Sequence, residues 1–125
     1  LINAIKKHDI IFIAIPLNKK NYSIFKKKHL QSLKKNSIII SVSREEIFDQ
    51  KYLTNFIKKN KRINFGIDFF SHEFLKKNNS ILKQQNVTLT PHIAGLSDTY
   101  VNRHLKLLLN NIKNFQNKKK LTNRI

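Results

Sequence analysis

The sequence predicts an α/β fold in which helices flank a parallel sheet. Short apolar runs without polar alternation recur at residues 10–15, 37–42, 64–68 and 87–90. Such runs are typical of strands that are covered on both faces. Between several of these runs, apolar residues recur at helical spacing. Strands that alternate with helices form parallel sheets with right-handed crossovers. We therefore assign the four runs to one parallel sheet.

The first half of the chain contains two of these strands. Residues 1–7 are expected to be the end of a helix, and Pro16 ends the strand predicted at residues 10–15. Residues 25–35 are amphipathic, which indicates a helix between the strands. The second strand, at residues 37–42, is rich in the β-branched side chains that strands favour.

The next predicted helix follows Asp49, whose side chain can accept a hydrogen bond from an unpaired N–H of the first turn. Its apolar residues recur at helical spacing: Tyr52, Leu53, Phe56 and Ile57. A third strand at residues 64–68 follows this helix. Residues 71–84 have no clear period, and we interpret them as a long loop.

The fourth strand, at residues 87–90, precedes a long helix predicted at residues 97–117, with Ser97 as its N-cap. Five apolar residues share one face of this helix: Val101, Leu105, Leu108, Ile112 and Phe115. The basic tail at residues 118–125 is expected to fray.

Length and composition exclude several classes of protein. The 125 residues suit one domain with its own core. There is no Cys, which excludes disulfides and thiolate metal sites, and no histidine pair has zinc spacing, so no metal site is expected. The longest apolar run, at residues 10–17, is too short to span a bilayer. There is also no Met, so we expect this sequence to be a piece of a longer protein.

The formal net charge of +18 raises the alternative of a nucleic-acid-binding domain. Charge alone does not specify such a surface, and the lysines are scattered along the chain. Lys, Asn and Ile are all abundant and share A/T-rich codons, so a nucleotide bias explains the charge more simply. We do not expect a nucleic-acid partner.

Chemically active side chains follow three of the predicted strands, where open α/β sheets bind their ligands. Arg44 could bind a carboxylate through two parallel hydrogen bonds, and His92 could act as a general acid or base. Glu73, if it faces His92, would favour the imidazolium. Asp68 could accept a hydrogen bond from a cofactor amide, or it could cap the loop that follows. Each residue taken alone also fits an ordinary loop position.

Taken in order, the motifs are more specific than any single residue. They are Ile15-Pro16-Leu17, Val42-Ser43-Arg44, Asp49, Gly66-x-Asp68-x-Phe70-x-x-Glu73, and Asn86-Val87-x-x-Thr90-Pro91-His92-Ile93-Ala94-Gly95. This order resembles the D-isomer-specific 2-hydroxyacid dehydrogenase family, over residues 9–125. The resemblance implies a Rossmann-like parallel sheet that is incomplete, because only the second half of the cofactor-binding domain is present. Residues 1–117 would be the C-terminal part of that domain with its return helix, and residues 118–125 the basic tail.

The resemblance also implies a role for each candidate residue. Arg44 would bind the carboxylate and carbonyl oxygen of a small 2-keto or 2-hydroxy acid. Glu73 would pair with His92, which protonates the keto oxygen as hydride arrives. The cofactor would be NAD, with NADP as a possibility. The positions implied to bind it are Pro16, Val42, Ser43, Arg44, Asp68, His92, Ala94 and Gly95.

Some positions depart from the family pattern. Glu45 and Glu46 stand where a glycine often follows the arginine, and Phe74 replaces a proline. Asn18 replaces a common threonine, and Glu73 argues against the formate dehydrogenase branch. The Gly-rich phosphate-binding turn of the family would lie upstream of Leu1. The 125-residue segment is therefore expected to be inactive by itself.

The resemblance implies that the complete protein is a cytoplasmic homodimer without a membrane partner. A non-catalytic dinucleotide-binding regulatory module of the same fold remains an alternative, because relatives with that role can keep the arginine, glutamate and histidine.

Overall fold

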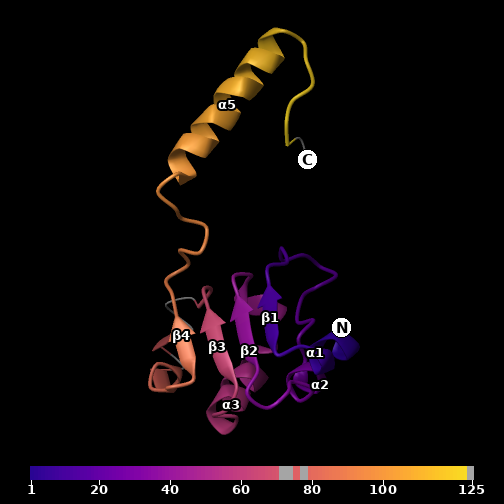
Figure 1. Ribbon diagram of the computed structural model, residues 1–125, viewed down its shortest axis with the longest axis vertical. Helices are drawn as coiled ribbons and strands as arrows, with labels where there is room; N and C mark the ends of the chain where they lie inside the picture. The colour runs from indigo at the N-terminus through magenta and orange to yellow at the C-terminus, as the bar shows by residue number, and fades with distance from the viewer. Residues whose placement is uncertain (71–74, 77–78, 124–125) are drawn as a thin grey trace. The chain divides into compact units, whose positions relative to one another are not determined.

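The computed structural model describes residues 1–70, 75–76 and 79–123, and it divides into two units, Leu1–Ala94 and Gly95–Ile125, which are described separately (Figure 1). In the first unit, four strands pair in parallel in the order β1-β2-β3-β4, which confirms the predicted fold class. The strands are β1 (Ile10–Ile13), β2 (Ile38–Ser41), β3 (Asn64–Ile67) and β4 (Val87–Leu89).

Each strand ends one or two residues earlier than predicted, yet the hydrogen-bond ladder continues one step further. The first residue after β2, Val42, donates its N–H to the carbonyl of Ile13 at 3.0 Å. Asp68 donates in the same way to Ser41, and Thr90 to Ile67, each at 3.0 Å. These residues therefore form an ordered row directly beyond the sheet.

Helices cover one face of the sheet. They are α1 (Ile2–Lys7), α2 (Lys27–Leu30) and α3 (Gln50–Lys59), with two 3₁₀ turns, η1 (Glu45–Ile47) and η2 (Asn79–Ile81). The predicted cap of α3 is confirmed, because the Asp49 carboxylate accepts the N–H of Tyr52 at 3.1 Å. Leu53 and Ile57 on this helix are fully buried against the sheet.

The helix α2 is much shorter than the predicted helix at residues 25–35. Phe25 forms an isolated parallel bridge with Phe48, donating its N–H to Ile47 and accepting that of Asp49. Because these bonds hold Phe25 in an extended segment beside the entrance to α3, the helix begins only at Lys27.

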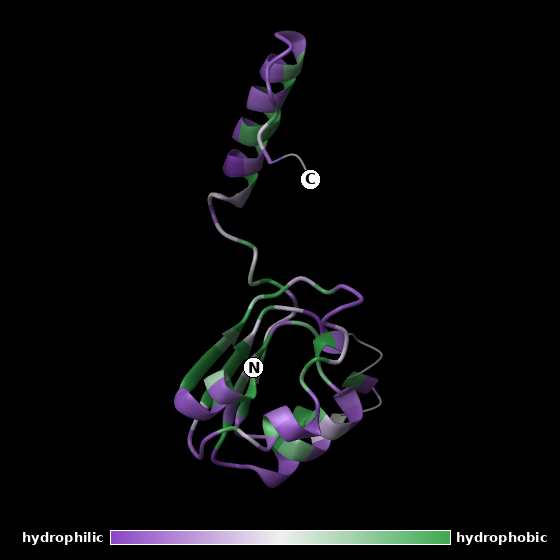
Figure 2. Ribbon diagram, turned by 90° about the vertical axis from the view of Figure 1, so that its right-hand side faces the viewer, coloured by the Kyte–Doolittle hydropathy of each residue, from purple (hydrophilic) through white to green (hydrophobic). Residues whose placement is uncertain are grey.

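The strands place alternate side chains on opposite faces of the sheet. Ile39, Phe65 and Ile67 point into the core with α3, and each is at least 95% buried. On the other face, Phe12 is 72% exposed and Ile10 is 54% exposed. The hydrophobic colouring of the strands in Figure 2 follows from both sets of side chains.

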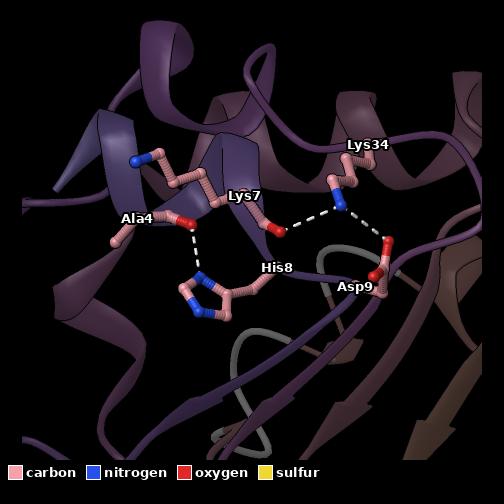
Figure 3. Close-up of polar contacts among 5 residues, drawn as sticks. All are labelled: Ala4, Lys7, His8, Asp9 and Lys34. Carbon is pink, nitrogen blue, oxygen red and sulfur yellow. Dashed lines mark hydrogen bonds and ion pairs between the residues drawn. The ribbon is translucent and has the colours of Figure 1, made fainter.

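Polar contacts join the segments that enter β1 and β2 (Figure 3). The Lys34 ammonium donates to the carbonyl of Lys7 and to the Asp9 carboxylate, both at 3.0 Å. His8 Nδ1 lies 2.8 Å from the carbonyl of Ala4. The Asp9 side chain is 77% exposed and that of Lys34 is 37% exposed. Ion pairs near the surface contribute about 0–1 kcal/mol, so these contacts orient the segments more than they stabilise them.

The second unit consists mainly of helix α5 (Tyr100–Gln116). The prediction that Ser97 caps it is wrong: Thr99 occupies the N-cap, and no side chain caps the first turn. Ser97 lies three residues before the helix, where its hydroxyl accepts a hydrogen bond from the Arg103 guanidinium at 2.9 Å. The predicted apolar face is present and exposed on α5, and Figure 2 shows it as a band along the helix.

The tail after α5 is more ordered than expected. The amide of Asn111 bonds both the N–H and the carbonyl of Thr122, at 2.9 and 3.0 Å. Lys118 has a positive φ of 55°, which turns the chain back at the end of the helix.

Candidate active site

The carboxyl edge of the sheet carries a continuous row of residues from neighbouring strands. Ile13, Ser41, Ile67 and Leu89 are partners in register, so the next residues of the central strands and of β4 are neighbours: Val42, Asp68 and Thr90. The ladder bonds beyond the strands fix the backbone of this row. Side chains that follow the row are therefore presented from a rigid base.

Asp68 is the centre of this row and is only 5% exposed. Its Oδ1 accepts hydrogen bonds from the Thr90 hydroxyl and from the main-chain N–H of Ile93, the latter at 2.9 Å. Its Oδ2 accepts the N–H of Ala94 at 2.8 Å. These bonds match neither role that the sequence left open for Asp68, because the carboxylate binds the segment after β4 and not the loop that directly follows it.

The surroundings of Asp68 favour its charged form. Burial raises the pKa of this carboxyl, but the hydrogen bonds from Thr90, Ala94 and Ile93 and the nearby His92 together lower its pKa below the ordinary value. Hydrogen bonds to an ionised carboxylate are short and strong, so an anion is stable at this buried position.

His92 lies in the segment that Asp68 holds, which we call the 90–94 loop (residues 90–94). Its φ of 58° is in the left-handed region, which costs a residue with a Cβ roughly 1–2 kcal/mol. The residue is exposed. An exposed imidazole on an anchored loop is accessible to a ligand, and imidazole is the side chain that most often serves as a general acid or base.

The end of β2 is joined to the end of β1 through Ser43, which is buried. Its hydroxyl donates to the carbonyl of Ile15. Arg44 follows, is exposed, and donates one guanidinium N–H to the carbonyl of Ser43 at 2.8 Å. A guanidinium has several further donors in a planar fork, so Arg44 keeps the capacity to bind a carboxylate.

Two hollows of the first unit reach this edge, and the second also extends along the strands past Ile38, Ile40 and Gly66. One, of about 600 Å³, is lined by four of the predicted cofactor residues, Pro16, Val42, Ser43 and Arg44. The other, of about 370 Å³, is lined in part by Val42, Asp68 and Ala94. Because Val42 lines both, the hollows are adjacent.

Not all predicted site residues belong to this arrangement. Glu73 lies outside the described residues, so its pairing with His92 stays a prediction. Gly95 belongs to the second unit, so its predicted contact with the cofactor also stays a prediction. Sequence reasoning missed Thr90 as a partner of Asp68. The usable signal was that Thr90 and Asp68 each directly follow an apolar strand, and these two strands are neighbours.

A larger hollow of the first unit, about 1080 Å³, lies elsewhere, beside α3 and the turn before β3. It is open and contains none of the predicted site residues, so we attach the chemistry to the carboxyl edge instead. Among the described residues, no group of three acidic or histidine side chains could hold a metal ion, and no helix is long and apolar enough to cross a membrane.

Comparison with known proteins agrees with this geometry. Residues 1–94 match the family described as "D-isomer specific 2-hydroxyacid dehydrogenase, NAD binding domain". The chain belongs to this family. The match ends at Ala94, the residue that also closes the first unit, so the sheet and the 90–94 loop are the family's NAD-binding framework.

Individual members of the 2-hydroxyacid dehydrogenase family support the assignment. The glyoxylate reductase of Thermofilum pendens is 30% identical over 108 residues, which cover 86% of this chain and 32% of that protein. A solved acyclic imino acid reductase in complex with NADPH and D-Arg is 30% identical, with a TM-score of 0.82, and the match covers 96% of this chain and 38% of that one.

A second solved structure, D-lactate dehydrogenase with NAD⁺ from Lactobacillus jensenii, is 25% identical with a TM-score of 0.81 over 96% of this chain and 40% of that one. The chain therefore spans only 32% of the length of the curated relative. It spans 38% and 40% of the two solved chains. The predicted cofactor class, a nicotinamide dinucleotide, is confirmed at the level of the family.

Proposed function

We propose that the full-length protein interconverts a small 2-keto acid and the corresponding 2-hydroxy acid, with NAD or NADP as the hydride carrier. One observation carries the proposal: in a domain of this family, the hollow lined by Arg44 and the anchored 90–94 loop with His92 both lie at the carboxyl edge of the sheet.

The residues at this edge fit a nicotinamide cofactor. Pro16 and Val42 give the hollow of about 600 Å³ at this edge an apolar wall, which suits the face of a flat ring. Asp68 Oδ2 accepts one hydrogen bond, from Ala94, and a carboxylate oxygen has room for a second, such as one from a carboxamide. When bound, the nicotinamide supplies or takes up the hydride.

The protein's own groups then orient the acid and move the proton. Arg44 binds the substrate carboxylate through its guanidinium fork, which aligns the neighbouring carbonyl carbon. His92 donates a proton to the carbonyl oxygen during reduction and removes it during oxidation. Glu73 is assigned to keep His92 protonated for reduction, on the resemblance alone.

The direct test is NADH or NADPH oxidation by the full-length protein with glyoxylate, hydroxypyruvate or pyruvate, followed by absorbance. We expect turnover with at least one of these acids, and a loss of roughly 10²–10⁴-fold in kcat for His92→Asn. His8→Asn is the matched control, because His8 bonds Ala4 before β1, away from the carboxyl edge. Absence of turnover with every 2-keto acid, or full turnover by His92→Asn, would contradict the proposal.

The proposal also covers the location, the oligomeric state and the activity of the isolated segment. We propose a cytoplasmic homodimer, and that the 125-residue segment alone is inactive. Exposed apolar side chains on the sheet support both points, since Phe12 is 72% exposed and Ile10 is 54% exposed. Size-exclusion chromatography of the full-length protein, and an activity assay of the segment, test these points. The family match favours neither a non-catalytic module nor a nucleic-acid-binding domain.

A further inference from the structure

We propose that Asp68 is a positioning residue: its carboxylate, fixed at the end of β3, gathers three donors of the 90–94 loop and thereby holds the backbone on both sides of His92. The importance of His92 rests on the proposed function, whereas the anchoring of the loop does not. The role differs from the cofactor contact that the family resemblance implies for this residue.

The anchor itself is rigid. The Asp68 N–H bonds the carbonyl of Ser41 on β2, and the carbonyl of Ile67, the residue before it, accepts the N–H of Thr90. The main chain that carries the carboxylate is therefore held from both neighbouring strands. A side chain rooted in a sheet is placed more accurately than one on a loop.

The three donors surround His92 in the sequence. Thr90 precedes it by two residues, and the N–H groups of Ile93 and Ala94 follow it. Because one carboxylate binds all three, the chain between them has to curve around the carboxylate. His92 lies within that curve.

The curve explains the unfavourable backbone of His92. A φ of 58° is disfavoured for a residue with a Cβ, and it persists only where surrounding contacts hold it. Ile93 and Ala94 are exposed, and the bonds that their N–H groups make to Asp68 are the contacts available to do so. Without the carboxylate, these contacts are lost and the loop relaxes toward ordinary φ values.

The first measurement reads the anchor directly, without activity. In the full-length protein without cofactor, amide hydrogen exchange at Ile93 and Ala94 should be slow for exposed residues. Asp68→Asn replaces one acceptor oxygen by an NH₂ group, and we expect at least about tenfold faster exchange at one or both amides. Unchanged exchange at both amides would overturn the proposal.

Thr90→Val supplies a gentler variant in case Asp68→Asn does not fold. It removes one donor to Asp68 and keeps the shape of the side chain, so exchange at Ile93 and Ala94 should accelerate in the same direction but less. Thr88→Val is the matched control. Thr88 is an exposed threonine on β4, and the hydroxyl that donates to Asp68 is that of Thr90. Equal effects of the two variants would contradict the anchor.

The second measurement separates positioning from cofactor binding. For Thr90→Val and Asp68→Asn we expect kcat to fall by more than the KM for the cofactor rises, because a displaced proton donor slows the chemical step. A raised cofactor KM with unchanged kcat would assign Asp68 to the cofactor and overturn the proposal. If the wild-type protein shows no turnover, the enzymatic proposal fails, while the exchange measurement still decides the anchor.

Discussion

The carboxylate of Asp68 lies 2.8 Å from the main-chain nitrogen of Ala94, 26 residues further along the chain, and accepts its hydrogen bond. Together with the bond from Ile93 at 2.9 Å, this contact joins the end of β3 to the segment that follows β4. A charged acceptor beneath two consecutive amides fixes a loop more firmly than a neutral one does.

Acid should weaken the folded protein through Asp68. Its folded-state pKa lies below the ordinary value of 3.8, so the unfolded chain binds more protons in acid. The stabilisation is present above that ordinary value and is lost as pH falls through the lower, folded-state pKa. Urea unfolding from about pH 5 downward should show this loss. Asp68→Asn should have a lower free energy of unfolding than wild type at pH 5, and this difference should shrink as the pH falls. A difference that does not change with pH would contradict the role of the Asp68 charge.

His29 should impose a second dependence, at milder pH. Burial, then Lys28 and Lys26 among the nearby positive charges, lower the pKa of His29 below its ordinary value of 6.5. Its Nδ1 accepts the N–H of Lys26 at 3.1 Å, which requires the ring nitrogen to be unprotonated. Because the unfolded chain binds the proton more readily, stability should be full above pH 6.5 and should fall as pH drops below it.

The matched variants for this effect are His29→Asn and His8→Asn. The first keeps an acceptor near Lys26 but removes the titrating ring, so it should flatten the dependence of urea midpoint on pH between about 7 and 5. The second removes an exposed imidazole and should leave the slope as in wild type. A wild-type slope in His29→Asn would exclude His29 as the source.

Arg44→Lys should mainly weaken the binding of the keto acid. Lys keeps the charge but lacks the planar fork, so one of two parallel hydrogen bonds to the carboxylate is lost, each contributing about 1.5–3 kcal/mol. We expect KM for the acid to rise roughly tenfold or more. Arg62→Lys is the control, because Arg62 is exposed and precedes β3 at the opposite edge of the sheet. Similar KM values for both variants would remove Arg44 from the substrate site.

Glu73→Gln tests the residue that lies outside the described part of the chain. The charge of Glu73, if it faces His92, favours the imidazolium that reduction requires. Removing that charge should move the alkaline limb of the pH–rate profile for keto-acid reduction to lower pH. One pH unit of movement corresponds to about 1.4 kcal/mol of lost interaction. An unmoved limb would make Glu73 a loop carboxylate without this role.

Local chemistry explains what could be predicted from the sequence. The four parallel strands follow from apolar runs at residues 10–15, 37–42, 64–68 and 87–90, and the cap of α3 follows from Asp49. Arg44 and His92 could be predicted as site residues because the residues that stop an apolar run mark the end of a strand. These signals lie within a few residues of the feature they specify, so a single sequence contains them.

Tertiary structure decided the features that depend on distant partners. Phe25 reads as helical from its neighbours, but a bridge to Phe48 makes it extended. The sequence left two roles open for Asp68, and neither included the observed bonds to residues 22 to 26 positions away. Such contacts exist only once β3 and β4 pair in register, because pairing brings Thr90 and the amides after His92 over the carboxylate. The sequence thus determined which side chains stand at the carboxyl edge, and the folded sheet determined which of them hold the others in place.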